Sequence, residues 1–300
     1  MWIYYGMILL SVGMFGGGFA MQDLYRKKRG SGLKISMEAA CIGSLAGLAV
    51  LFAISGFDLA LTPFTLLMAV CSALNGMAFT FCAFKALDYI NLSLFSLFAM
   101  LGGMLLPFLQ GIFFYNEGFT LAKAICVLFI CAALLCTVER SEKKKGFLFY
   151  AGVFVLNGMA GVISKLFTAS DLPKASAAAY SLWIAIATAV LSGIAWLALS
   201  LAERRRTPQT EREATPTRRT ILQSYGIGAA QGAINRVANY LLVIALVQVD
   251  ASIQYPMVTG GTMIVSTVLS FFGDKKPSRR ELLSVGLAFL GMLLLFLIPV

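Results

Sequence analysis

The polar residues best placed to bind a ligand lie together in one apolar stretch of the chain. Gln231, Asn235 and Asn239 are spaced four apart, so they form one stripe on a helix. Arg236 lies beside this stripe. Its planar guanidinium matches a carboxylate or a phosphate, and the amides would supply neutral hydrogen bonds. We therefore expect this stripe to bind the anionic group of a small solute.

Three further amides are expected to belong to the same site. They are Asn75, the counterpart of Asn235 in an internal repeat, with Asn157 and Gln254. A guanidinium inside a membrane costs about 2.5–3.5 kcal/mol even on the lenient insertion scale, so Arg236 needs a compensating partner. No acidic residue lies near the middle of another predicted span to supply one. In the alternative interpretation, Arg236 bonds to backbone carbonyls or extends to the membrane surface, and the amides join helices.

The composition of the chain is that of a membrane protein. Of its 300 residues, 59% are hydrophobic and 13% are charged, whereas ordinary soluble domains contain about 25% charged residues. The apolar runs are long and unbroken, which excludes an outer-membrane barrel, because barrel strands alternate apolar and polar residues. The same composition excludes a soluble enzyme, a nucleic-acid-binding domain and a disordered chain. We expect an all-α polytopic membrane protein.

Apolar runs bounded by charges, proline or glycine predict ten transmembrane helices, each of roughly 20 residues. They are Ile3–Met21, Ile35–Gly56, Phe64–Phe84, Asn91–Phe114, Leu121–Val138, Phe147–Thr168, Ala175–Leu201, Ile221–Val247, Ala251–Phe272 and Glu281–Ile298. A polar linker, residues 202–219, separates the seventh span from the eighth.

The distribution of basic residues predicts the orientation. Loops that follow odd-numbered spans carry most of the 24 lysines and arginines, including Arg26–Arg29 and Lys143–Lys145. Because basic loops are held on the cytoplasmic side, we expect these loops and the linker in the cytoplasm and both termini outside. The net charge of +10 thus faces the headgroups of an inner or plasma membrane. The expected partner of this charge is the lipid bilayer and not nucleic acid.

Short sequences recur in the same order in the two halves of the chain. Ala73-Leu74-Asn75, for example, recurs as Ala233-Ile234-Asn235. Residues 1–140 and 141–300 are therefore predicted to be two five-helix repeats. Because five is odd, the second repeat must be inverted in the membrane, as in many secondary transporters. A gene duplication without a surviving transport role is the alternative.

A pattern of small residues that ends at an acidic turn occurs in both halves. It comprises Ala83–Ile90 (Ala-x-x-Ala-Leu-x-Tyr-Ile), Ser93, Pro107 and Glu117 in the first, and Ala245, Asp274, Gly286 and Gly291 in the second. The pattern resembles the drug/metabolite transporter superfamily, in its ten-span EamA-like branch. This resemblance implies movement of small metabolites, amino acids or drugs across the inner or plasma membrane.

The lack of an acidic residue in the first predicted span restricts the class of solute that we expect. Small multidrug-resistance proteins of the same superfamily exchange protons for cations at a glutamate in their first span, and the matching stretch here, Leu9–Met14, has no acid. We therefore expect a secondary transporter that exchanges or facilitates the movement, in the export direction, of a small anionic or zwitterionic metabolite such as an amino acid. An exporter of drugs and lipophilic compounds is the first alternative, and a membrane scaffold subunit that does not transport is the second.

No enzymatic activity and no cofactor are expected. The chain has no histidine, and no carboxylate pair, nucleophile–base pair or metal-ligand group falls at depth in a predicted span. The six cysteines lie within apolar runs without CxxC spacing, which predicts packing between helices. The small-molecule solute is the expected partner, and a homodimer is left open.

Two local patterns predict structure. Glycine pairs spaced four apart let helices approach closely, and they occur at Gly13/Gly17, Gly43/Gly47 and Gly228/Gly232. Ser278-Arg279-Arg280-Glu281 matches a capping box, which predicts the start of the last span.

Overall fold

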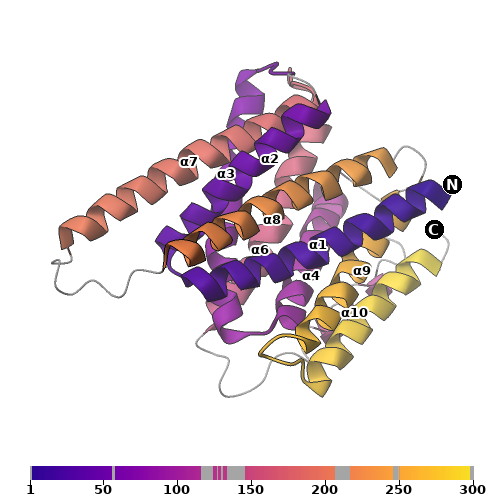
Figure 1. The fold of residues 1–300 in the computed structure, drawn as a ribbon. Coiled ribbons are helices and arrows are strands. Elements are labelled where there is room, and N and C mark those ends of the chain that lie inside the picture. Colours follow the sequence, from indigo (N-terminus) through magenta and orange to yellow (C-terminus); the bar gives the residue numbers. More distant parts are fainter. Residues whose placement is uncertain are drawn as a thin grey trace.

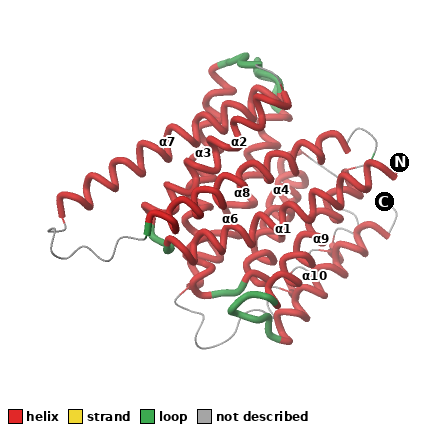
Figure 2. The backbone as a smooth tube through the Cα atoms, viewed as in Figure 1, coloured by secondary structure: helices red, strands yellow, loops and turns green. Residues whose placement is uncertain are grey.

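The structure is a computed structural model of the chain. It describes residues 2–55, 58–115, 124–126, 128–129, 131–133, 146–206, 217–245, 249 and 251–297. Among these residues every regular element is a helix, and short loops join the helices (Figure 2).

Long helices occupy nine of the ten predicted spans. They are α1 (Trp2–Arg29), α2 (Leu33–Ser55), α3 (Pro63–Tyr89), α4 (Leu92–Tyr115), α6 (Phe147–Ala169), α7 (Ala177–Arg206), α8 (Arg218–Ala245), α9 (Ala251–Phe271) and α10 (Arg279–Leu297). The fifth predicted span, Leu121–Val138, lies largely outside the described residues. The main difference from prediction is in α1 and α7, which continue as helices through the basic residues at their ends.

The described helices have the length and surface of membrane spans. Six of them, α1, α2, α3, α4, α6 and α7, are long and apolar enough to cross a membrane. Large apolar side chains such as Leu67, Phe113 and Leu148 are exposed on the surface of the bundle, where lipid would cover them. The chain is therefore a multi-pass helical membrane protein. Helix α8 is not among the six, because Arg236 and the neighbouring amides lower its hydropathy.

Helix starts follow from local sequence. Thr62 caps α3, since its hydroxyl accepts a hydrogen bond from the Thr65 amide at 3.1 Å, and a proline follows at the first helical position. The predicted capping box of α10 is confirmed. The Ser278 amide donates to the Glu281 carboxylate at 2.7 Å, and the Glu281 amide donates to the Ser278 hydroxyl at 3.3 Å.

Eight of the helices pack side by side in a closed ring. The order around the ring is α1, α9, α4, α6, α3, α7, α2, α8 and back to α1, and α10 packs outside it on α9 and α4. Neighbours in the ring are mostly distant in sequence. In Figure 1, for example, α8 lies along both α1 and α2.

The ring divides into two groups of helices, each built from both halves of the chain. In the group that we call the first bundle, α8 packs on α1 and α2, and α9 packs on α1. In the second bundle, α6 packs on α3 and α4, and α7 packs on α3. The pairs α4–α9 and α2–α7 join the two bundles. Contacts of α2 with α3, and of α1 with α3 and α4, also join the bundles.

Glycines bring helices within each bundle into close contact. A Cβ atom on Gly232 of α8 would lie 2.0 Å from the carbonyl oxygen of Gly43 in α2, so the backbones of these helices touch. The predicted packing role of these glycines is thus confirmed. The prediction for Gly13 and Gly17 is wrong, because no atom of the described residues of other helices lies within 4 Å of a Cβ on either. Gly16 is the glycine of α1 that contacts α9. A Cβ on Gly16 would lie 2.4 Å from the Cγ1 atom of Val265, whereas Gly13 lies on another face of α1.

Candidate functional site

Helix α8 presents its polar residues to two neighbouring helices. The Oδ1 atom of Asn235 lies 2.7 Å from the position of a Cβ on Gly18, so this amide faces α1. Arg236 follows directly in sequence and points about 100° away around the helix. Its Cγ and Nε atoms lie 2.9 and 3.3 Å from the position of a Cβ on Gly47, so its side chain faces α2. The missing side chains of Gly18 and Gly47 make room for both polar residues.

The guanidinium of Arg236 has no partner among the described residues. The side chain is partly exposed, and it makes no hydrogen bond or ion pair with the part of the chain that the structure describes. A buried or membrane-embedded arginine requires an anion or a set of acceptors. An anionic group entering between α8 and α2 would meet this requirement.

The other amides of α8 and α9 have fewer unpaired hydrogen-bonding atoms than the Arg236 guanidinium. Asn239 is exposed, and its amide donates to the Asn235 carbonyl at 2.7 Å within the same helix. Gln231 is partly buried, one turn before Asn235. Gln254 of α9 is buried and donates to the Leu242 carbonyl of α8 at 3.0 Å, while its Oε1 atom has no partner among the described residues. That oxygen is a second unsatisfied polar atom of the expected site.

Asn75 and Asn157 join helices in the second bundle. The Asn75 amide donates to the Leu156 carbonyl of α6 at 2.9 Å. The Asn157 amide donates to the Ala99 carbonyl of α4 at 2.6 Å. Helix α3 makes no contact with α8 among the described residues, so Asn75 does not lie against Asn235. These two amides hold α6 against its neighbours.

The expected site residues therefore fall into two sets, one in each bundle. The first bundle holds Gln231, Asn235, Arg236, Asn239 and Gln254, and the second holds Asn75 and Asn157. Only the first set contains a charged side chain without a described partner.

A cluster of charged residues lies where α1 and α3 end, α4 begins and a loop joins α9 to α10; we call this the charged end. Arg26 of α1 contacts the Asp88 carboxylate of α3 at 2.6 Å and Asp23 at 2.7 Å. Lys27 pairs with Asp23 at 3.1 Å and with Asp274, after α9, at 2.9 Å. The hydrogen bond from Lys27 lowers the pKa of Asp274 below its usual range.

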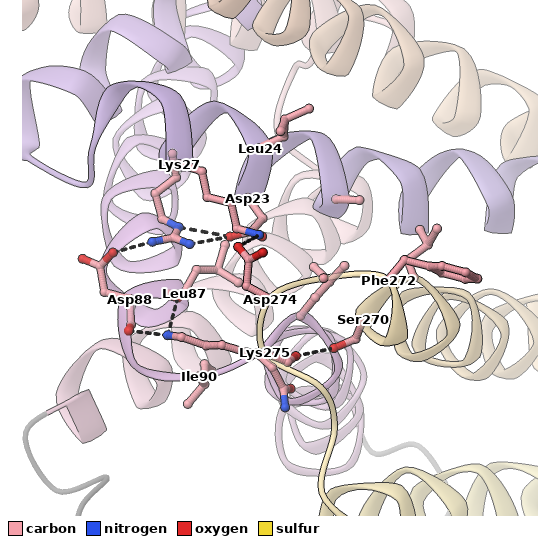
Figure 3. Close-up of a pocket in the computed structure, with 16 residues that line it drawn as sticks. Asp23, Leu24, Lys27, Leu87, Asp88, Ile90, Ser270, Phe272, Asp274 and Lys275 are labelled. Carbon is pink, nitrogen blue, oxygen red and sulfur yellow. Dashed lines mark hydrogen bonds and ion pairs between the residues drawn. The ribbon is translucent and has the colours of Figure 1, made fainter.

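The charged end surrounds a cavity of about 480 Å³ (Figure 3). Its charged lining consists of Asp23, Arg26, Lys27, Asp88, Asp274 and Lys275. The Lys275 ammonium donates to the backbone carbonyls of Leu87 and Asp88, and its pKa is lowered chiefly because burial disfavours the charged form. The α9–α10 loop is thereby fastened to the end of α3.

Sequence reasoning placed Asp88 and Asp274 at the ends of spans and assigned no binding role to them or to Asp23. A signal was nevertheless present, because spans one, three and nine end on the same side of a membrane. Asp23, Asp88 and Asp274 stand near those three ends. Topology thus places them on the same side as the basic residues there, whereas the pairing of Asp88 with Arg26 depends on how the helices pack.

Metal and thiol chemistry find no support in the described residues. No group of three or more Asp, Glu or Cys there is arranged to hold a metal ion. The described cysteines, Cys41, Cys71, Cys82, Cys126 and Cys131, are free thiols. Cys136 lies outside the described residues.

No protein-family model matches this chain, and no curated protein sequence does either. Among solved structures, one crystal structure aligns with 96% of this chain and 97% of its own, with a TM-score of 0.58 and 19% sequence identity. The likeness is one of fold. It extends over nearly the whole chain, so the arrangement of helices described above recurs in a protein of very different sequence.

Proposed function

We propose that this protein is a secondary transporter of the EamA-like branch of the drug/metabolite transporter superfamily. It has ten transmembrane helices in two inverted repeats, with the charged end in the cytoplasm. Its substrate is a small anionic or zwitterionic metabolite such as an amino acid, which it exchanges or exports without a cofactor. Arg236 binds the anionic group of that solute.

The observation that carries this proposal is the symmetry of the helix packing. Exchanging α1 with α6, α2 with α7, α3 with α8 and α4 with α9 converts α1–α8 into α6–α3, α1–α9 into α6–α4 and α2–α8 into α7–α3, and all these pairs are in contact. The pairs α4–α9 and α2–α7 convert into themselves. This pattern supports a two-fold axis between the halves, the frame on which inverted-repeat transporters expose one site to either side.

The free guanidinium supports the choice of solute. Arg236 lies past the middle of α8 and faces α2, and no described acid compensates its charge. A scaffold subunit would gain nothing from a polar residue that costs insertion energy. A pocket for lipophilic cations would be opposed by this positive charge, which disfavours the multidrug alternative.

Thermal unfolding of the detergent-purified protein with candidate solutes tests the proposal. Ligands that bind the folded state raise the unfolding midpoint, so amino acids, organic acids, sugar phosphates and lipophilic cations are screened in turn. Arg236→Ala is compared with Arg219→Ala, which removes an exposed arginine near the start of the same helix. We expect an anionic or zwitterionic metabolite to stabilise the wild type and Arg219→Ala, and to lose its effect in Arg236→Ala.

Two other outcomes would contradict the proposal. Stabilisation by lipophilic cations alone, equal in wild type and Arg236→Ala, would favour the drug exporter. If no solute stabilises the protein and reconstituted vesicles show no flux, the scaffold subunit becomes the better description.

A further inference from the structure

At the charged end, one helix of the first bundle touches two helices of the second bundle. Helix α1 contacts α3 and α4 there, and both are helices of the second bundle. The symmetric counterparts of these contacts would join α6 to α8 and α9 at the opposite end, and no such contact is made by the described residues. Helix α2 also contacts α3 between the bundles, and its symmetric counterpart, a contact of α7 with α8, is likewise not made by the described residues.

The contacts that cross the ring form two layers. The outer layer centres on Asp88 of α3. Its carboxylate accepts hydrogen bonds from Arg26 of α1 and from Ser31 in the loop that joins α1 to α2, so both donors belong to the first bundle. The inner layer is aromatic. Phe19 of α1 meets Phe95 of α4 edge-on with ring centroids 5.1 Å apart, and Tyr25 lies 5.9 Å from Phe84 of α3.

Asp88 holds the outer layer together more than any other acid of the cluster. Asp23 pairs with bases of its own helix, and Asp274 pairs with Lys27, so both remain within the first bundle and its loop. Asp88 instead lies on α3, and among the described residues its side chain and carbonyl are bonded by α1 and by the loops next to α2 and α9. Its charge therefore acts between the bundles.

We infer that Asp88 is a gating residue, which holds the two bundles together at the charged end of the transport path. The inference rests on the proposed transport function, because a gate has meaning only for a path. Opening this gate separates Asp88 from Arg26, and the bundles then rock at the α4–α9 and α2–α7 interfaces.

Cysteine accessibility tests the gate without a solute. In a variant lacking the native cysteines, Ala83→Cys places a thiol on α3 at a fully buried position of the apolar cluster on which Phe19 packs. A membrane-impermeant maleimide is applied from the charged end, in inside-out vesicles. We expect Asp88→Asn to raise the labelling rate about fivefold, the population shift that follows from losing one partly exposed ion pair.

Asp274→Asn is the matched control. It removes the same charge from the same cavity, but its partner Lys27 belongs to the same bundle, so the labelling rate is expected to stay at the wild-type value. Arg26→Gln removes the Asp88 ion pair from its other side and is expected to raise labelling as Asp88→Asn does. Asp88→Glu keeps the charge and is expected to label more slowly than Asp88→Asn.

Either of two results would overturn the inference. One is wild-type labelling in both Asp88→Asn and Arg26→Gln, and the other is an equal rise in Asp274→Asn. Because labelling requires no solute, the gate can fail while the solute screen succeeds, and the reverse also holds.

Discussion

Substituting alanine for one of two glycines that face each other tests the packing of the first bundle. Gly43 and Gly232 meet where α2 crosses α8, but a side chain would affect them differently. A Cβ on Gly232 would lie 2.0 Å from the Gly43 carbonyl oxygen, whereas a Cβ on Gly43 would meet its nearest atom, the Gly228 carbonyl oxygen, at 3.5 Å. The first distance is a clash with backbone, and the second is ordinary van der Waals contact.

The expected cost follows from this difference. A carbon normally approaches a carbonyl oxygen no closer than about 3.3 Å, so Gly232→Ala must move the helices apart by roughly 1.3 Å. Overpacking costs typically about 1–3 kcal/mol, and the upper value applies because backbone cannot rotate away. Alanine returns about 1 kcal/mol through helix propensity, so the net loss is about 2 kcal/mol. Gly43→Ala keeps the propensity gain without the clash.

Denaturant titration in detergent micelles measures both variants. Gly232→Ala is expected to lower the midpoint at unchanged slope, and Gly43→Ala to leave it equal to or above that of the wild type. Equal midpoints for the two variants would refute the described crossing of α2 and α8. Arg236 lies one turn beyond Gly232 and also faces α2, so Gly232→Ala is further expected to weaken solute binding.

Three more predictions concern single contacts. Lys27 lowers the pKa of Asp274. The pair therefore stabilises the fold above the ordinary Asp pKa of about 3.9, and this contribution is lost as pH falls through the lowered pKa. On acidification, the thermal midpoint of Asp274→Asn should therefore fall less than that of the wild type. Ser278→Ala removes half of a capping box and should cost about 1 kcal/mol of unfolding free energy, with faster amide exchange at the start of α10. Asn157→Ala should cost about 0.5–2 kcal/mol because it breaks a hydrogen bond between α6 and α4, whereas Asn239→Ala, exposed and bonded within its own helix, should leave the unfolding midpoint unchanged.

Much of the fold could be predicted because membrane spans are a local property. A run of about 20 apolar residues must be a helix in lipid, where every backbone polar group needs a partner within the segment. The predicted bounds of the fourth and sixth spans, Asn91–Phe114 and Phe147–Thr168, differ from α4 and α6 by one residue at most at either end. The capping box of α10 is equally local, since its donors and acceptors lie within four residues.

The site could be predicted in part. Spacing alone places Asn235 and Arg236 on adjoining faces of one helix, but not which helices those faces meet. The structure turns Asn235 toward α1 and Arg236 toward α2. Asn75 is separate from both, because its amide donates to a backbone carbonyl of α6. Packing partners depend on how helices distant in sequence fit together, and apolar composition does not encode that fit.

Sequence by itself determined that this protein is helical and membrane-embedded, and that one span carries a cation with no acid at the same depth. Tertiary structure decided that helices from both halves combine in two bundles, and that Asp88, on α3, meets Arg26 of α1 between them. The physical reason is the range of the forces involved. Hydrophobic transfer and capping act on each segment separately, whereas ion pairing and backbone contact between helices act only across a few ångströms, and so exist only once the helices are assembled.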